Sequence, residues 1–149
     1  MKTHRIKRLL LSGLSTVTNN THEFENSPGK IETLWADYVE TKTYSKTFNT
    51  TKEHHMYGVY SEYANGKDGD YKVTVAVEVS KNKNAILIEN QKYLVFKNKG
   101  ELPQIVIDTW SQVWKYFEDD NSEFKRAFTI DFEKYMENDE IELYISING

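Results

Sequence analysis

The sequence predicts an α+β fold in which a β-α-β-β unit occurs twice. Apolar residues recur at the helical spacing i, i+3, i+4 and i+7 in two stretches: Ile31, Leu34, Trp35 and Tyr38, and later Trp110, Val113, Trp114 and Phe117. Two strand-like segments follow each of these stretches. A duplicated helix-and-sheet unit with aromatic residues on its helix faces indicates two halves that enclose a groove, and we expect the function to lie there.

The first unit begins with a predicted strand over residues 6–18, which are rich in Leu, Val and Thr. Residues 19–27 are polar and predict a loop. Ser27 is expected to cap a helix whose first position is Pro28, because the missing N–H of proline would be unpaired there in any case. The Thr- and Lys-rich residues 41–52 show no clear period, so they predict a frayed helix end and a loop.

Two strands complete the first unit. Residues 56–63 predict the first of them and residues 71–79 the second, in which every alternate residue from position 73 is a valine. Between them, residues 65–70 predict a turn, because Gly66 and Gly69 accept a positive φ without steric cost. The alternating valines indicate a strand with one apolar face.

The second unit repeats this order. Residues 85–97 predict a strand with a kink around residues 90–92, and Pro103 opens the second helix. Residues 126–136 and 141–147 predict the last two strands. In both of them apolar residues alternate with polar ones, so each strand is expected to present one apolar and one polar face.

The length of the chain and its even composition indicate one domain. The 149 residues suit one domain or two small units that share a core. No flexible Gly/Ser segment separates the two halves. We therefore expect a single domain over residues 1–149, with pseudo-repeats at about 1–80 and 81–149.

Charge and composition exclude several classes of function. The formal net charge of −4 argues against nucleic acid or an anionic membrane as the main partner. The absence of cysteine excludes disulfides, thiolate catalysis and Cys-ligated zinc, and it is compatible with a reducing cytosol. No apolar run approaches the ~20 residues of a membrane-spanning helix. The short apolar run near the start is broken by Ser12, Gly13 and Ser15, so we expect a cytoplasmic protein.

No sequence motif of a metal, cofactor or catalytic site is present. The four histidines are scattered or adjacent in a polar loop, at His4, His22, His54 and His55, which does not favour a metal site. The chain contains no G-x-S-x-G, no P-loop and no G-x-G-x-x-G sequence. We therefore assign no catalytic residue and expect neither a cofactor nor a metal.

Several segments together resemble a known family. They are YGVYSEY (57–63), GDYKVTVAVEV (69–79), KYLVFKNKGELPQIVIDTW (92–110), RAFTIDFEKY (126–135) and the ending EIELYISI. Their number and order resemble the GyrI-like family, also called AraC-type effector-binding domains, and in particular its stand-alone, integron-associated members. The resemblance covers nearly the whole chain.

The resemblance implies a concave antiparallel sheet with two helices that flank a ligand groove. Members of the family are multidrug-sensing domains of transcription regulators, free-standing drug-binding proteins, relatives of gyrase inhibitors and, in some branches, hydrolases of reactive natural products. Regulator members carry a DNA-binding module before this domain. Here the family-like pattern begins within a few residues of Met1, so direct binding of nucleic acid is not expected.

The resemblance also implies a carboxylate in the groove, because multidrug-binding members hold lipophilic cations with a buried acid. Glu133 is the first candidate, since it lies in the DFEKY segment and on the polar face of its strand. Glu142 is the second candidate, on the polar face of the next strand. If the two acids lie close together, one of them has a raised pKa and stays protonated until a cation arrives.

Aromatic residues are the expected walls of the groove. Their faces attract cations by ~0.5–2 kcal/mol each, and flat apolar walls accept many ligand shapes. The candidates are Trp35, Trp110 and Trp114 from the helices and Tyr60, Tyr71, Tyr93 and Tyr144 from the strands.

Three functions remain open at this point. The first is a cytoplasmic protein that binds amphipathic, cationic, drug-like small molecules. The second is a hydrolase of reactive natural products that uses the same pocket. The third is a protein-interaction role, with gyrase or the transcription machinery as the partner.

Overall fold

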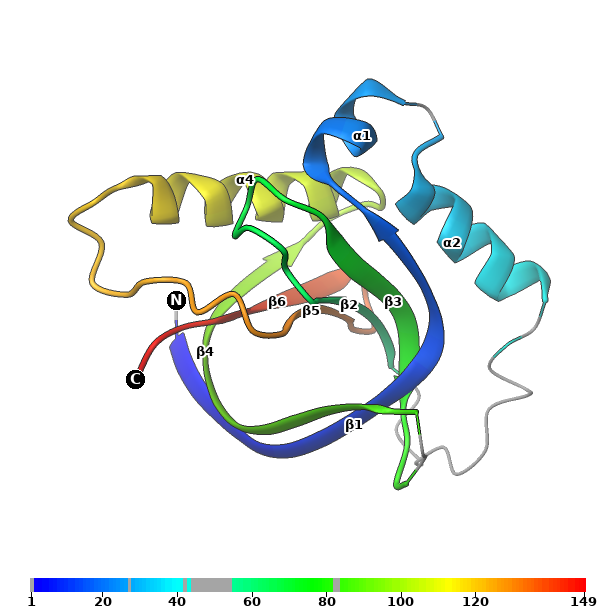
Figure 1. Ribbon diagram of the computed structural model, residues 1–149, viewed down its shortest axis with the longest axis horizontal. Coiled ribbons are helices and arrows are strands. Elements are labelled where there is room, and N and C mark those ends of the chain that lie inside the picture. The colour runs from blue at the N-terminus through cyan, green and yellow to red at the C-terminus, as the bar shows by residue number, and fades with distance from the viewer. Residues whose placement is uncertain (1, 27, 42, 44–54, 82–83) are drawn as a thin grey trace.

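The computed structural model describes residues 2–26, 28–41, 43, 55–81 and 84–149 (Figure 1). The elements of the first half are β1 (Lys2–Thr18), α1 (Asn20–Glu25), α2 (Lys30–Glu40), β2 (Met56–Ser61) and β3 (Tyr71–Glu78). Those of the second half are β4 (Ile86–Lys99), α4 (Gln104–Glu118), β5 (Asp131–Tyr135) and β6 (Glu140–Ser146). Within the described ranges, no helix combines the length and apolar character that crossing a membrane requires.

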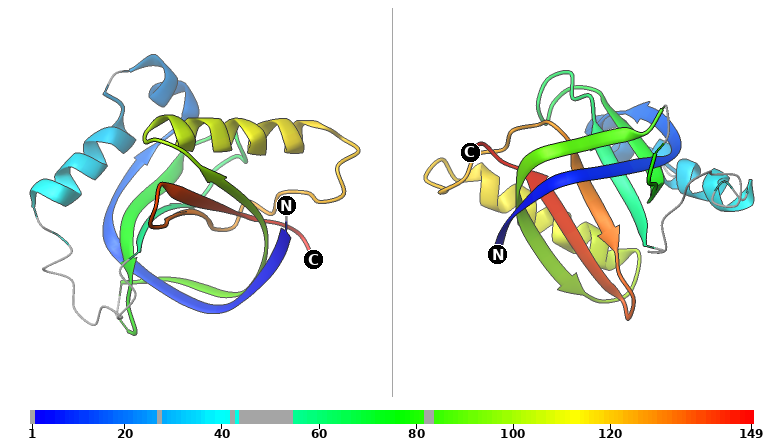
Figure 2. Two further views of the ribbon diagram at one scale, coloured as in Figure 1. Left: turned by 180° about the vertical axis from the view of Figure 1, so that it is seen from behind. Right: turned by 90° about the horizontal axis from the view of Figure 1, so that it is seen from below.

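The six strands form one antiparallel sheet that closes on itself, in the order β1-β3-β2-β5-β6-β4. Closure depends on β1, which is long and strongly curved (Figures 1 and 2). Its residues 11–18 pair with β3, and its residues 2–11 pair with β4. One face of the closed sheet therefore points inward, and the helices lie against the other face.

Three hydrophobic clusters follow from this arrangement. The inner cluster draws on all six strands and contains the stacked rings of Phe132 and Tyr144, with centroids 4.5 Å apart. A second cluster lies between α4 and the outer faces of β4 and β6, where Val113 meets Leu143. The third cluster packs α2 and its buried residue Leu34 against the outer side of β3. The predicted helical stripes thus face the sheet.

The predicted tandem order is confirmed, with corrections at three places. Residues 20–25 form a short helix, α1, where the polar composition had predicted a loop. The strand expected over 126–136 is shorter, since β5 begins at Asp131 and only an isolated bridge pairs Arg126 with Ile147. The expected kink in β4 coincides with Asn90, whose φ is 50°. The boundaries of the single domain and its pseudo-repeats stay a prediction.

The start of α2 is the third correction. The helix begins at Lys30 rather than at Pro28, and its N-cap Gly29 offers no side-chain hydrogen bond. Ser27, the expected cap, lies outside the described residues. The carboxylate of Glu23 in α1 instead accepts hydrogen bonds from the backbone N–H groups of Lys30 and Ile31, both at 3.0 Å. An acid at a helix N-terminus satisfies unpaired donors and complements the helix dipole, so α1 holds α2 in place.

Candidate functional site

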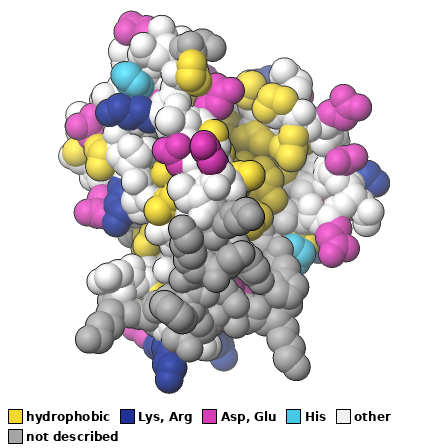
Figure 3. Space-filling model, turned by 90° about the vertical axis from the view of Figure 1, so that its right-hand side faces the viewer, with side chains coloured by type: hydrophobic (Ala, Val, Ile, Leu, Met, Phe, Trp, Pro, Cys, Tyr) yellow, Lys and Arg dark blue, Asp and Glu magenta, His cyan; other side chains and the backbone are white. Residues whose placement is uncertain are grey.

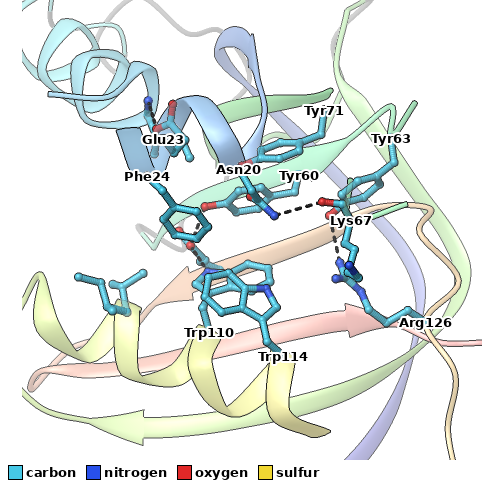
Figure 4. Close-up of a pocket in the computed structure, with 14 residues that line it drawn as sticks. Asn20, Glu23, Phe24, Tyr60, Tyr63, Lys67, Tyr71, Trp110, Trp114 and Arg126 are labelled. Carbon is cyan, nitrogen blue, oxygen red and sulfur yellow. Dashed lines mark hydrogen bonds between the residues drawn. The ribbon is translucent and has the colours of Figure 1, made fainter. Parts of the chain in front are cut away.

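A cavity of about 250 Å³ lies on the outer face of β2, β3 and β5, between α1 and α4 (Figure 4). Most of its wall is aromatic or aliphatic. The aromatic lining consists of Phe24, Tyr60, Tyr63, Tyr71, Trp110 and Trp114. Figure 3 shows hydrophobic side chains gathered in a hollow on the side of the molecule where α2 lies. Such a concave apolar site with a few polar groups is typical of small-molecule binding.

Glu133 is the buried acid of this cavity. It comes from the middle of β5, and only 2% of its surface is exposed. Its Oε2 accepts hydrogen bonds from the Tyr60 hydroxyl at 2.9 Å and from the Trp110 indole N–H at 2.6 Å. Its Oε1 accepts a hydrogen bond from the Tyr135 hydroxyl at 2.6 Å. The acid is thus held by three uncharged donors, and among the described residues no cation forms an ion pair with it.

Burial dominates the electrostatics of Glu133. Loss of hydration raises its pKa above the ordinary value of 4.5, although the hydrogen bonds from Tyr135, Trp110 and Tyr60 oppose that rise. Burial, followed by the nearby Glu133 charge, also raises the pKa values of Tyr60 and Tyr135 well above 10.0. Both phenols therefore stay protonated at neutral pH and remain donors to the acid.

A glycine makes room for the Glu133 carboxyl. Gly58 in β2 is the register partner of Glu133. A Cβ atom at position 58 would lie 2.5 Å from Oε1 of Glu133 and 3.5 Å from the indole ring of Trp35. Contacts of 2.5 Å are not tolerated by a buried carboxyl, so the absence of a side chain at Gly58 permits the observed placement of the acid.

A second buried acid lies two residues before Glu133 and has a different environment. Asp131 is fully buried and forms an ion pair with Arg126 at 2.6 Å. It also accepts hydrogen bonds from Tyr63 and from the backbone N–H and hydroxyl groups of Ser146. Arg126 lines the cavity, and this pairing compensates its charge.

The structure brings together part of the predicted site. Glu133, Tyr60, Tyr71, Trp110 and Trp114 all line the cavity. Tyr60 meets Trp110 edge-on, with ring centroids 5.1 Å apart, and Trp110 lies 6.1 Å from Trp114. These contacts join α4 to the sheet around the acid.

The other four predicted residues do not line this cavity. Trp35 packs edge-on against Tyr135 at 5.1 Å, and the Tyr135 hydroxyl donates to the acid. Tyr93 is fully buried in the inner cluster, where Tyr144 packs against it. Glu142 forms an ion pair with Lys97 at 3.1 Å and accepts a hydrogen bond from Tyr144. Their roles in binding stay predictions.

The condition that the two acids lie close together is not met, because the register of β5 and β6 places them on opposite faces of the sheet. Glu133 pairs with Leu143, whereas Glu142 pairs with Lys134. Paired residues share a face, and neighbours along a strand alternate. The polar face of β5 therefore lies beside the apolar face of β6.

Sequence reasoning missed the contribution of α1 and of the segment around Arg126. Asn20, Glu23 and Phe24 of α1 line the cavity, together with Lys67 and Arg126. Phe24 carried a signal, since it is the one apolar residue in the polar stretch 19–27. Its ring is 72% exposed and meets Trp114 edge-on at 5.9 Å.

A metal site was not expected from the sequence. Within the described ranges, no group of three or more His, Cys, Asp or Glu side chains could hold a metal ion. His54, one of the adjacent histidines, lies outside the described residues.

The cavity and fold agree with a defined class of protein. Residues 8–147 match the family described as Cass2, integron-associated effector binding protein, and the chain belongs to this family. Among its relatives is YobU of Bacillus subtilis (strain 168), which is named as a candidate transcriptional regulator. The two sequences are 28% identical over 136 residues, which cover 85% of this chain and 81% of YobU.

Solved structures share the fold. The integron cassette protein VCH_CASS2 of Vibrio cholerae superposes with a TM-score of 0.83 at 27% identity, over 99% of this chain and 95% of that one. SAV2435, solved bound to tetraphenylphosphonium, superposes with a TM-score of 0.74 at 16% identity, over 99% of this chain and 93% of that one. The chain is thus an effector-binding protein by family.

Proposed function

We propose that this protein binds amphipathic, cationic small molecules in the cavity between α1 and α4, with Glu133 as the counter-charge. The observation that carries the proposal is a buried carboxyl that borders an apolar cavity and whose hydrogen-bond donors, within the described part of the chain, are all uncharged. A carboxylate removed from water is costly unless a cation accompanies it. An arriving cation removes that cost and gains the attraction of the ionised acid.

The walls of the cavity suit the same ligand. Trp110 and Tyr60 lie directly against the acid, so a cation near Glu133 also lies near their rings. Each such contact contributes ~0.5–2 kcal/mol. Contacts with the apolar wall do not depend on direction as hydrogen bonds do, so the wall accepts ligands of different shapes. The proposed selectivity is therefore for charge and size rather than for one chemical structure.

The known ligand of SAV2435 supplies a probe for this proposal. Tetraphenylphosphonium is a cation surrounded by phenyl rings, which is the chemistry that a buried acid with aromatic neighbours would recognise. The fold alone links the two proteins at 16% identity, so the ligand is a proposal for this chain. We place its action in the cytoplasm, where the absence of cysteine is compatible with a reducing environment.

A pair of ions of similar shape and opposite charge tests the proposal. Tetraphenylphosphonium at ~100 times its Kd should stabilise the native state by about 2.7 kcal/mol and raise Tm by about 5–10 °C. Tetraphenylborate, the anion of similar shape, should produce no such shift. Equal shifts with both ions, or none with either, would contradict the proposal.

Matched variants locate the charge. In Glu133→Gln the side chain keeps its size but cannot ionise, so the phosphonium-induced shift in Tm should largely disappear. Glu142→Gln is the control, since it makes the same change on the opposite face of the sheet. The ligand-induced shift is compared within each variant, because Glu142→Gln also removes the ion pair with Lys97. Retention of the shift in Glu133→Gln would exclude this acid as the counter-charge.

A hydrolase is the second candidate function. It is favoured by the same acid, because a buried carboxyl with a raised pKa is suited to protonating a strained, electrophilic substrate. Mass spectrometry of a cyclopropane-bearing electrophile tests it under single-turnover conditions. A product formed by the wild-type protein and absent with Glu133→Gln would support hydrolysis, and unchanged substrate would exclude this reaction.

A further inference from the structure

A second cavity adjoins the one that contains Glu133. It has a volume of about 890 Å³, and Asn20, Phe24, Lys67, Trp114 and Arg126 line both cavities. We call the cavity with Glu133 the inner cavity and the second one the outer cavity. These names do not refer to the faces of the sheet, since the inner cavity lies on the outer face of β2, β3 and β5. Phe24 and Trp114 are in edge-on contact at 5.9 Å, and because they line both cavities they lie at the boundary between them. Figure 4 shows the two rings at the edge of the cavity with Glu133.

The volumes indicate that a ligand extends into both cavities. Drug-sized ligands occupy pockets of roughly 300–1,000 Å³. The inner cavity, at about 250 Å³, is smaller than that range, and the outer one lies within it. A ligand whose cationic part lies beside Glu133 would therefore place its remaining part beyond Phe24 and Trp114.

The outer cavity offers hydrogen-bond donors that are not fully used. Lys125 lines it, and the acceptors of its Nζ atom among the described residues are uncharged: the carbonyl of Asp120 at 2.7 Å and the hydroxyl of Ser122 at 3.5 Å. Arg126 has a side chain that is 8% exposed, and its buried Nε has no hydrogen-bond partner in the described part of the chain. Lys67 forms an ion pair with Asp68, and both side chains are 69% exposed.

The acids nearby leave these donors available. Asp68 can be replaced as the partner of Lys67 at little cost, since exposed ion pairs contribute only ~0–1 kcal/mol. Glu23 lines the inner cavity, but its carboxylate is engaged by Thr18 and the N-terminus of α2. Glu118 is the remaining acid of the outer cavity, against the cations Lys67 and Lys125, since Asp131 compensates the charge of Arg126.

We propose that the natural ligand is an elongated zwitterion, with its cationic aromatic part in the inner cavity and a carboxylate in the outer cavity, where Lys67 and Lys125 bind it. This inference rests on the proposed function, because it assumes that Glu133 receives the cationic part. It adds a second charge of opposite sign to the recognised ligand class. The two charged groups of the ligand would then meet opposite charges at the two ends of one continuous site.

A pair of phosphonium compounds tests this inference. Carboxybutyl-triphenylphosphonium carries a carboxylate on a flexible tail, and its methyl ester has the same tail without the charge. By isothermal titration at low salt, the wild-type protein should bind the acid about fivefold more tightly than the ester, the effect expected of a partly exposed ion pair. The preference should decline as salt is raised.

The variants separate the two charged groups of the ligand. The double variant Lys67→Gln/Lys125→Gln should bind the acid and the ester equally, so that the ratio of the two affinities falls from about five to about one. The double variant Lys99→Gln/Lys115→Gln is the control, because it removes the same two charges from residues that line neither cavity and should keep the preference.

Each outcome has one meaning. If the wild-type protein binds both compounds equally, or if the double variant keeps the preference, the inference fails while the proposed function stands. If neither compound binds, the proposed function fails and the inference fails with it.

Discussion

Strand β5 carries two buried acids, and they differ in the partners that compensate their charge. Asp131 is 0% exposed and Glu133 is 2% exposed, and both side chains lie on the outer face of the strand. Asp131 has Arg126 as a cationic partner, whereas the donors to Glu133 among the described residues are two phenols and an indole. The first acid is compensated within the fold, and in the proposed function a cationic ligand compensates the second.

The largest effect is expected where the compensated pair is broken. Arg126→Ala leaves the charge of Asp131 buried and unpaired, so the free energy of unfolding should fall by about 3–5 kcal/mol, measured by urea denaturation. Arg126→Lys, which keeps the positive charge, should lose less. A loss below ~1 kcal/mol in Arg126→Ala would show that Asp131 does not depend on its partner.

The next effect concerns the space that Glu133 occupies. In an ordinary strand, Gly→Ala is stabilising by ~0.5–1 kcal/mol because it restricts the unfolded chain. Gly58→Ala should have the opposite sign and cost about 1–3 kcal/mol, since the new Cβ atom would lie 2.5 Å from the Glu133 carboxyl.

A double-mutant cycle sharpens this test. The cost of Gly58→Ala should shrink or change sign when Glu133→Ala has already removed the carboxyl, and urea denaturation of the four proteins measures the coupling. An equal cost in both backgrounds would mean that the carboxyl is not what occupies the space above Gly58.

The third test concerns how the contribution of Glu133 to the unfolding free energy depends on pH. The pKa of Glu133 is higher in the folded than in the unfolded chain, so between 4.5 and the folded pKa the native state binds more protons. The contribution of this acid to stability should therefore fall as pH rises above 4.5. The unfolding free energy of the wild type should therefore fall relative to that of Glu133→Gln, which cannot ionise at this position. The difference between the two proteins should grow as pH rises through this range and then become constant above the folded pKa. A difference that does not change with pH would refute the raised pKa.

The smallest effect on stability is expected at the boundary of the two cavities. Phe24 is 72% exposed, so Phe24→Ala should change the unfolding free energy by no more than ~0.5 kcal/mol. Its affinity for tetraphenylphosphonium should nevertheless fall about two- to fivefold, the loss of one exposed cation–π contact. Val39 is also 72% exposed and lines neither cavity. Val39→Ala is therefore the control and should leave the affinity unchanged. Equal affinities of wild type and Phe24→Ala would remove Phe24 from the site.

The sequence predicted the elements whose signal is local. Alternating valines predicted β3, and the spacing of Trp110, Val113 and Trp114 predicted the helix that borders the cavity. The choice of Glu133 over Glu142 came from the family resemblance, because both acids lie on the polar side of an alternating strand. Local patterns specify which residues share a face within one strand, and they do not specify how neighbouring strands are aligned.

What the sequence missed depends on contacts between distant segments. The register that places Glu133 beside Leu143 is fixed by the turn and by packing, and neither can be read from the alternation. The helix α1 has six residues and none is buried, so it carries no periodic signal. Its Glu23 replaces a local N-cap for α2, and a cap supplied by another helix leaves no trace in the capped sequence.

The central claim is that Glu133 is a buried acid that lacks a cation and receives one from the ligand. Carbon NMR of the glutamate carboxyl groups measures this directly, with Glu133 assigned by the signal that is missing in Glu133→Gln. The free protein should show a midpoint for Glu133 above 4.5, and saturating tetraphenylphosphonium should lower it, because a nearby cation favours the ionised acid. A midpoint at the ordinary value of 4.5 that the ligand does not move would contradict the account.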